Sequence, residues 1–188
     1  MHDLRLVRYA TSLCMSPEQE QDHITLEEII SNAKEIMLRS GKHAPTLIME
    51  ASHNLVVTEV PSMPVTHEER VEFMRFIGQV AAQSGRVNQL QQVLLVSEGW
   101  LSMVQEDKLK MRPSEDPNRK EVLIISAIQI KERKKQMKVF EILRDNKAQV
   151  VGLEEFLPDE KKEDVSVDVP LLDAFVDGFQ MAFRARNN

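Results

Sequence analysis

Cysteine, long hydrophobic runs and aromatic side chains are all scarce in this chain of 188 residues. Its one cysteine, Cys14, cannot form an intramolecular disulfide, which favours a reducing cytoplasm as its setting. No stretch approaches the roughly 18 consecutive apolar residues of a membrane span, and the N-terminus lacks the apolar segment of a signal peptide. We therefore expect a cytoplasmic protein that makes no contact with a membrane.

The familiar signatures of catalysis and cofactor binding are also missing. The sequence contains no phosphate-binding loop, no dinucleotide-binding glycine motif and no nucleophile elbow. The spacings of histidine and cysteine that typify zinc sites do not occur either. The sequence therefore predicts no cofactor and no metal site, and it leaves open whether the protein is an enzyme.

Acidic residues outnumber basic ones by 30 to 24, so the formal net charge is −6. This total argues against a uniformly basic nucleic-acid-binding protein. The charge is unevenly distributed, however, because residues 108–144 hold 11 basic and 5 acidic groups. Four of these basic residues cluster in one predicted turn: Lys131, Arg133, Lys134 and Lys135. Such a cluster is commonly a solvated turn, but it also suits an acidic partner.

Two segments in the first half of the chain have the apolar spacing of amphipathic helices. Thr25 with Glu28, and Thr66 with Glu69, each form the pattern of a capping box, so a helix is predicted to follow each threonine. Gly41 stands where a left-handed residue would end the first helix.

Short apolar runs predict the strands. Residues 47–49 and 55–60 favour a β-hairpin, whereas 93–96, 122–130, 137–143 and 150–156 favour an antiparallel meander, because short turns join antiparallel neighbours. The sequence thus predicts an α+β fold. Its mainly antiparallel sheet would have five to six strands, with two amphipathic helices packed on it and a C-terminal helix. We expect the helices to cover one face of the sheet.

The pattern divides the chain into four parts. Residues 1–22 form an N-terminal arm, either a short strand or a mobile segment. Residues 23–156 form a single α+β domain, and residues 157–169 an acidic linker. Residues 170–188 form a C-terminal amphipathic helix that begins near Pro170.

The C-terminal helix carries Phe175, Phe179 and Phe183 one turn apart. Burying three phenylalanine side chains is worth roughly 5 to 8 kcal/mol, so this stripe will not remain in water. It either packs on the sheet of its own chain or docks on another subunit. The second alternative predicts self-association through the C-terminal helix.

The least ordinary stretch runs from 97 to 121. A strand would present Glu98 and Trp100 on one face, and a long loop over 103–119 would follow. A carboxylate in a buried strand needs a partner, and Arg112 or Arg119 is the candidate supplier. The candidate binding residues here are Glu98, Trp100, Arg112, Glu115, Asp116 and Arg119.

This stretch permits a functional and a structural interpretation. Glu98 with Glu115 or Asp116 could act as acid and base, or bind a hard cation. Alternatively, arginine–carboxylate pairs pin the loop to the sheet, and residues 114–116 form a cap or an Asx-type turn.

The segments Ser97-Glu98-Gly99-Trp100 and Arg112-Pro113-Ser114-Glu115-Asp116-Pro117-Asn118-Arg119-Lys120-Glu121 resemble a pattern in a family of uncharacterised bacterial, archaeal and phage proteins. No activity is assigned to that family. The resemblance implies that residues 97–121 are one unit, without naming a reaction.

The leading hypothesis is a non-catalytic binding or assembly protein, homo-oligomeric, that uses Trp100 and the loop 103–119. A hydrolase or metal-assisted enzyme built on Glu98, Glu115 and Asp116 is the first alternative. The second is a nucleic-acid-associated accessory protein that uses the basic meander.

Overall fold

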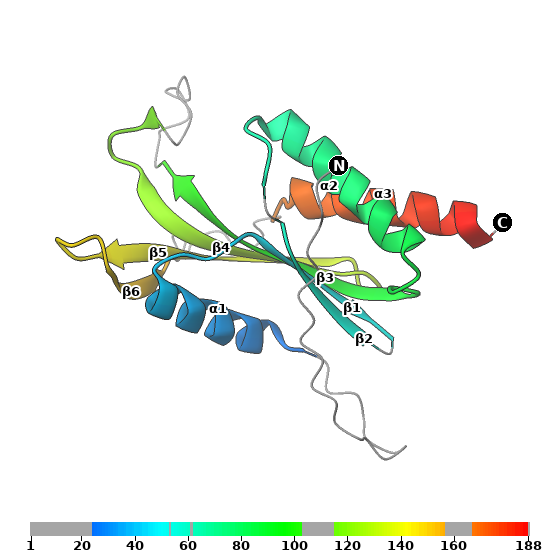
Figure 1. Ribbon diagram of the computed structural model, residues 1–188, viewed down its shortest axis with the longest axis horizontal. Helices are drawn as coiled ribbons and strands as arrows, with labels where there is room; N and C mark the ends of the chain where they lie inside the picture. Colours follow the sequence, from blue (N-terminus) through cyan, green and yellow to red (C-terminus); the bar gives the residue numbers. More distant parts are fainter. Residues whose placement is uncertain (1–23, 53, 61, 103–114, 157–166, 188) are drawn as a thin grey trace, which may run out of the picture.

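The computed structural model describes residues 24–52, 54–60, 62–102, 115–156 and 167–187 (Figure 1). The predicted N-terminal arm 1–22, Arg112 and most of the predicted linker 157–169 lie outside the described residues. The fold is α+β, with three helices and one six-stranded sheet. The elements are α1 (Leu26–Ser40), β1 (Thr46–Ala51), β2 (Asn54–Glu59), α2 (His67–Gln83), β3 (Leu90–Leu101), β4 (Lys120–Gln129), β5 (Lys134–Arg144), β6 (Val150–Glu155) and α3 (Pro170–Asn187).

Both predicted capping boxes are present. The hydroxyl of Thr25 accepts from the backbone N–H of Glu28, whose carboxylate accepts in return from the backbone of Thr25. Thr66 and Glu69 repeat the arrangement at the start of α2. Gly41 caps α1 in the left-handed conformation at φ 73°, so the local signals are sufficient to place these helix ends.

The sheet is antiparallel throughout, in the order β2-β1-β3-β4-β5-β6. The predicted hairpin and meander are both confirmed. The hairpin joins the meander through β1, which pairs with β3. Strand β3 is longer than predicted, because it begins at Leu90 and continues to Leu101.

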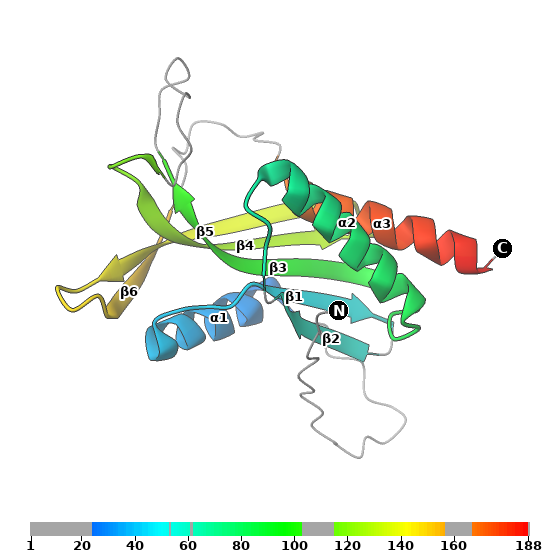
Figure 2. The ribbon, with the colours of Figure 1, turned by 45° about the horizontal axis from the view of Figure 1, so that its top comes forward.

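Helices cover both faces of this sheet, so the prediction that they share one face is wrong (Figures 1 and 2). Alternate residues of β1 show the division: Ile48 belongs to the core under α1, whereas Leu47 and Met49 belong to the core under α2 and α3. The physical reason is visible in β3. Its residues 93–96 are all buried, and a strand with no solvated face needs a cover on each side.

Helix α3 packs mainly against α2 and makes smaller contacts with the sheet. The two helices approach each other most closely at two glycines. A methyl group at Gly78 would overlap the carbonyl oxygen of Phe175, and one at Gly178 would overlap that of Arg75. The backbones therefore approach more closely than any side chain permits. Phe175 and Phe179 are 0% and 4% exposed within their own chain, and Phe179 stacks on Phe183.

Among the described residues, no helix is long and apolar enough to cross a membrane.

Gly78→Ala and Gly178→Ala are each expected to lower the free energy of unfolding. Alanine in place of glycine normally favours a helix by about 0.5–1 kcal/mol. Here the added methyl group must push the two backbones apart, which costs about 1–3 kcal/mol or more. Urea unfolding followed by circular dichroism measures the change.

Gly152→Ala in β6 is the matched control, because its new methyl group would meet Leu143 at an ordinary 3.5 Å. Equal stability of all three variants and the wild type would contradict the close helix contact.

Candidate functional site

Of the predicted site residues that the structure describes, Glu98 and Trp100 lie near the end of β3, and Glu115, Asp116 and Arg119 lie shortly before β4. Glu98 is paired with Leu123, and Trp100 with Glu121, across the β3–β4 ladder. Since Leu123 belongs to the core under α1, Glu98 and Trp100 share the α1 face, as the alternation predicts. Ser102 follows directly after β3, and its hydroxyl donates a hydrogen bond to Asp116 in the segment that precedes β4.

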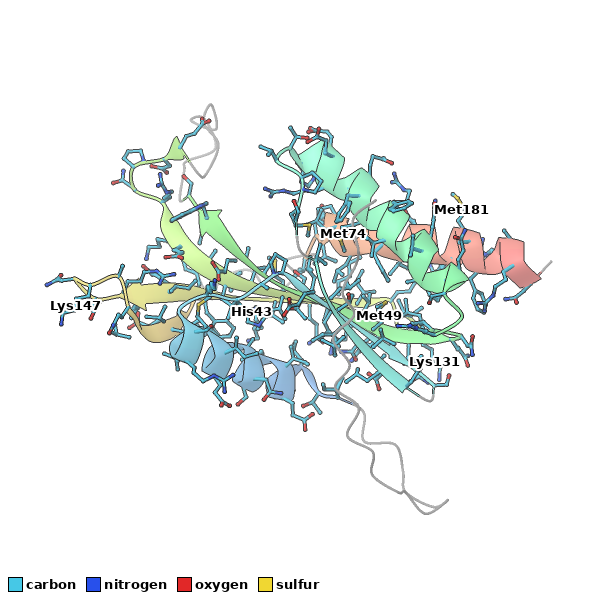
Figure 3. All side chains as sticks on the ribbon, viewed as in Figure 1. His43, Met49, Met74, Lys131, Lys147 and Met181 are labelled. Atoms are coloured by element: carbon cyan, nitrogen blue, oxygen red, sulfur yellow. The ribbon has the colours of Figure 1, made fainter. Side chains whose placement is uncertain are left out.

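Glu98 accepts a hydrogen bond from the backbone N–H of His43, 55 residues away in the sequence. His43 lies in the connection between α1 and β1 and is 7% exposed (Figure 3). No ion pair joins Glu98 to Arg119 among the described residues, and Arg119 stacks on Trp100; the other predicted partner, Arg112, lies outside the described residues. The backbone amide of His43 is thus one partner of this carboxylate, and no local pattern in the sequence indicates it.

Arg144 links β4 to the C-terminal end of α1 through its hydrogen bonds. Its Nε and Nη2 donate to both carboxylate oxygens of Glu121 at 2.6 Å. Its Nη1 and Nη2 also donate to the carbonyl oxygen of Gly41, at 3.2 Å each. The hydrogen bonds that Arg144 donates to Glu121, together with the charges of Glu121 and Glu98, raise the pKa of Arg144. Glu98, Glu121 and Arg144 together hold the C-terminal end of α1 on the sheet.

Asp116 closes the base of the loop. Its Oδ2 accepts from the hydroxyl of Ser102, and its Oδ1 accepts from the backbone N–H of Asn118 at 2.8 Å. The second bond is an Asx turn that begins at Asp116, two residues further along than the turn predicted at 114–116, and residue 114 lies outside the described residues. The bond from Ser102, followed by that from Asn118, lowers the pKa of Asp116. Asp116 is therefore a fixed anion that ties the end of β3 to the start of β4.

Trp100 and Arg119 form the exposed part of the site. The indole of Trp100 is 45% exposed. The guanidinium carbon of Arg119 lies 4.5 Å from the centroid of the ring, which is a cation–π contact. An aromatic ring and a planar cation thus present one continuous surface beside the loop.

The acidic residues of the site differ in their surroundings. Glu98 and Asp116 have separate partners, and Glu115 is exposed. Within the ranges that the structure describes, no three histidine, cysteine or acidic side chains are close enough to hold a metal ion. Asp116 thus holds the end of β3 to the segment before β4, next to the exposed Trp100.

Sequence reasoning missed a cavity of about 290 Å³ between the β1–β2 hairpin and the second half of α2. No spacing in the sequence marks this cavity, because it depends on the distance between a helix and a twisted edge strand. It is lined mainly by apolar side chains: Met49, Val56, Thr58, Glu59, Val60, Ile77, Val80, Ala81, Ser84, Arg86 and Val87.

Arg144→Met is expected to lower the free energy of unfolding by about 2 kcal/mol, because it leaves the partly buried Glu121 without its partner. Arg144→Lys should recover only part of this loss, since lysine keeps the charge but not the bidentate geometry. Urea unfolding at neutral pH measures both variants.

Lys138→Met serves as the control, because its ion pair with Glu155 is more exposed and should contribute less than about 1 kcal/mol. An Arg144→Met variant no less stable than Lys138→Met would show that Arg144 does not anchor α1.

Ser102→Ala is expected to raise the pKa of Asp116 toward its ordinary value of 3.8, because the largest cause of the lowering is removed. A lowered folded-state pKa stabilises the fold above pH 3.8, and this contribution is lost as the pH falls through the lowered value. An NMR titration of the Asp116 carboxyl carbon measures the pKa directly.

Ser97→Ala is the control, because Ser97 lies within β3 and forms no hydrogen bond with Asp116; it should leave the pKa of Asp116 unchanged. An unchanged pKa in Ser102→Ala would rule out the hydroxyl as the main partner.

Residues 5–177 match the family model described as Bacteriophage lambda protein ea47. Neither the curated proteins nor the solved structures yield a match to this chain. The matched region includes the stretch from 97 to 121 and extends from the N-terminal segment into α3. The chain therefore belongs to the family of bacteriophage lambda protein ea47.

Proposed function

We propose that this chain is a non-catalytic binding and assembly protein that self-associates through Trp100, Arg119 and the adjoining loop 103–119. The observation that carries the proposal is the stacking of Arg119 on a half-exposed Trp100. Tryptophan and arginine are the side chains that most often dominate the energy of protein interfaces. Stacking also restrains both side chains before they meet a partner, which lowers the entropy lost on binding.

The way the loop is anchored supports the same proposal. Asp116 binds Ser102 and Asn118, so the two ends of the loop are tied together at the sheet. A binding loop gains from such a rigid base. The same hydrogen bonds occupy Asp116, and Glu98 accepts from the backbone of His43, so two of the three carboxylates of the enzyme alternative hold the fold together. This supports binding over hydrolysis or metal-assisted chemistry.

The cytoplasm is the compartment that we propose for this protein. A single cysteine is compatible with a reducing compartment, where a disulfide would not persist.

Self-association through α3 stays a separate prediction. Phe175 and Phe179 already fill the core of their own chain, so this route requires two chains to exchange α3 and keep the same contacts. It would leave Trp100 unaffected.

Size-exclusion chromatography with light scattering at micromolar concentration tests the proposal. We expect the wild type to be an oligomer, and Trp100→Ala and Arg119→Ala to shift it toward the monomer. The fluorescence of Trp100, the only tryptophan, should change with protein concentration in the wild type.

Phe76→Ala is the matched control, because Phe76 is an exposed aromatic residue on α2, 56% exposed, away from the site. A monomeric wild type would contradict assembly. An oligomer that survives both site variants would contradict the proposed surface.

A further inference from the structure

Four segments that are far apart in the sequence meet at the end of the sheet opposite to Trp100. The amide of Asn54 donates to the carbonyl oxygen of Arg86, and Ser52 bonds Gln89. The backbone N–H of Ile130 donates to the carbonyl oxygen of Gln91 at 2.8 Å, which brings in the β4–β5 turn. Arg186 donates to the carbonyl oxygen of Ala82 at 2.8 Å, which brings in the end of α3.

We define the basic end as Ser52, Asn54 and residues 82–92, 129–135 and 183–187. These residues include seven basic side chains but a single acidic one, Glu132. Glu50 lies next to this end but is buried inside the sheet. The basic side chains are Arg86, Lys131, Arg133, Lys134, Lys135, Arg184 and Arg186.

Two of these cations are engaged within the chain. Lys135 forms an ion pair with Asp173 at 2.7 Å, and Arg186 caps α2 and stacks on Phe183. The other five are exposed, and none forms an ion pair with another described residue. They come from three separate elements, so the positive field covers a surface rather than a single turn.

We propose that the basic end binds the phosphate backbone of a nucleic acid. Free cations spaced over several elements suit a row of phosphates, which releases counterions as each is neutralised. Glutamine and asparagine side chains are interspersed among them, and such amides also donate to phosphate oxygens. The basic end gathers seven basic side chains and one acidic one in a chain whose net charge is −6, so its local charge is opposite in sign to that of the whole chain and attracts a polyanion.

This inference is independent of the proposed function. It uses none of the residues around Trp100, and Lys131 and Lys147 lie at opposite ends of the sheet (Figure 3). Nucleic-acid binding and self-association can therefore succeed or fail separately.

Fluorescence anisotropy with labelled duplex DNA, single-stranded DNA and single-stranded RNA tests the inference. If about four phosphates are contacted, raising the salt from 50 to 200 mM should weaken duplex binding by about 100-fold. The triple variant Lys131→Glu, Lys134→Glu, Arg184→Glu should weaken binding at 50 mM salt by more than 10-fold and make it less dependent on salt.

The matched control is Lys42→Glu, Lys147→Glu, Arg39→Glu. It changes the net charge equally, at two exposed lysines near turns and one arginine in the last turn of a helix, outside the basic end. Circular dichroism checks that both triple variants are folded.

Strong binding by the wild type and the control, with loss in the basic-end variant, supports the inference for whichever nucleic acid binds. No binding to any of the three probes at 50 mM salt overturns it. Equal loss in both triple variants also overturns it, because binding would then follow net charge alone. Binding to polyglutamate but to none of the nucleic acids would instead identify an acidic protein partner.

Discussion

The burial of β3 on both faces is the constraint on which the rest of this structure depends. Val93 and Leu94 point to opposite sides of the sheet, and both are 0% exposed. Each side must therefore supply apolar cover: α1 provides it on one face, and the α2–α3 pair on the other. Since α1 ends at Ser40, the part of β3 beyond it is free to carry polar residues. Glu98 and Trp100 lie there, which explains why the candidate site occupies this end of the strand.

The α2–α3 pair covers its face of the sheet through a close contact between the two helix backbones. Because Gly78 and Gly178 let two backbones touch, α3 lies close against α2 along its length and still reaches the sheet with Phe175. The same contact places the end of α3 beside the α2–β3 connection, where Arg186 bonds Ala82. A packing requirement in the core thus determines which charges meet at the basic end.

Local signals in the sequence predict the elements well, and distant contacts poorly. The two capping boxes, Gly41 and Pro170 place helix ends through interactions within a few residues. The apolar run of β3 already contained the signal for cover on both faces, and the prediction of a single covered face overlooked it. The partners of Glu98 and Arg144 have no such signal: His43 is 55 residues from Glu98, and Gly41 is 103 residues from Arg144. Only the strand order brings them together.

The excess of basic residues in 108–144 has two different physical roles, which the structure separates along the sheet. Four of these basic residues form ion pairs that join neighbouring strands, or a strand and a helix: Lys120, Lys135, Lys138 and Arg144. Lys131, Arg133 and Lys134 lie in and beside the β4–β5 turn, where no acidic strand residue stands opposite. A charge that is paired contributes little field beyond its partner, whereas an unpaired cluster attracts anions from a distance of about a Debye length, roughly 8 Å at physiological salt. The acidic total of the chain therefore does not describe the local field at the basic end, where Lys131, Arg133 and Lys134 form no ion pair with another described residue.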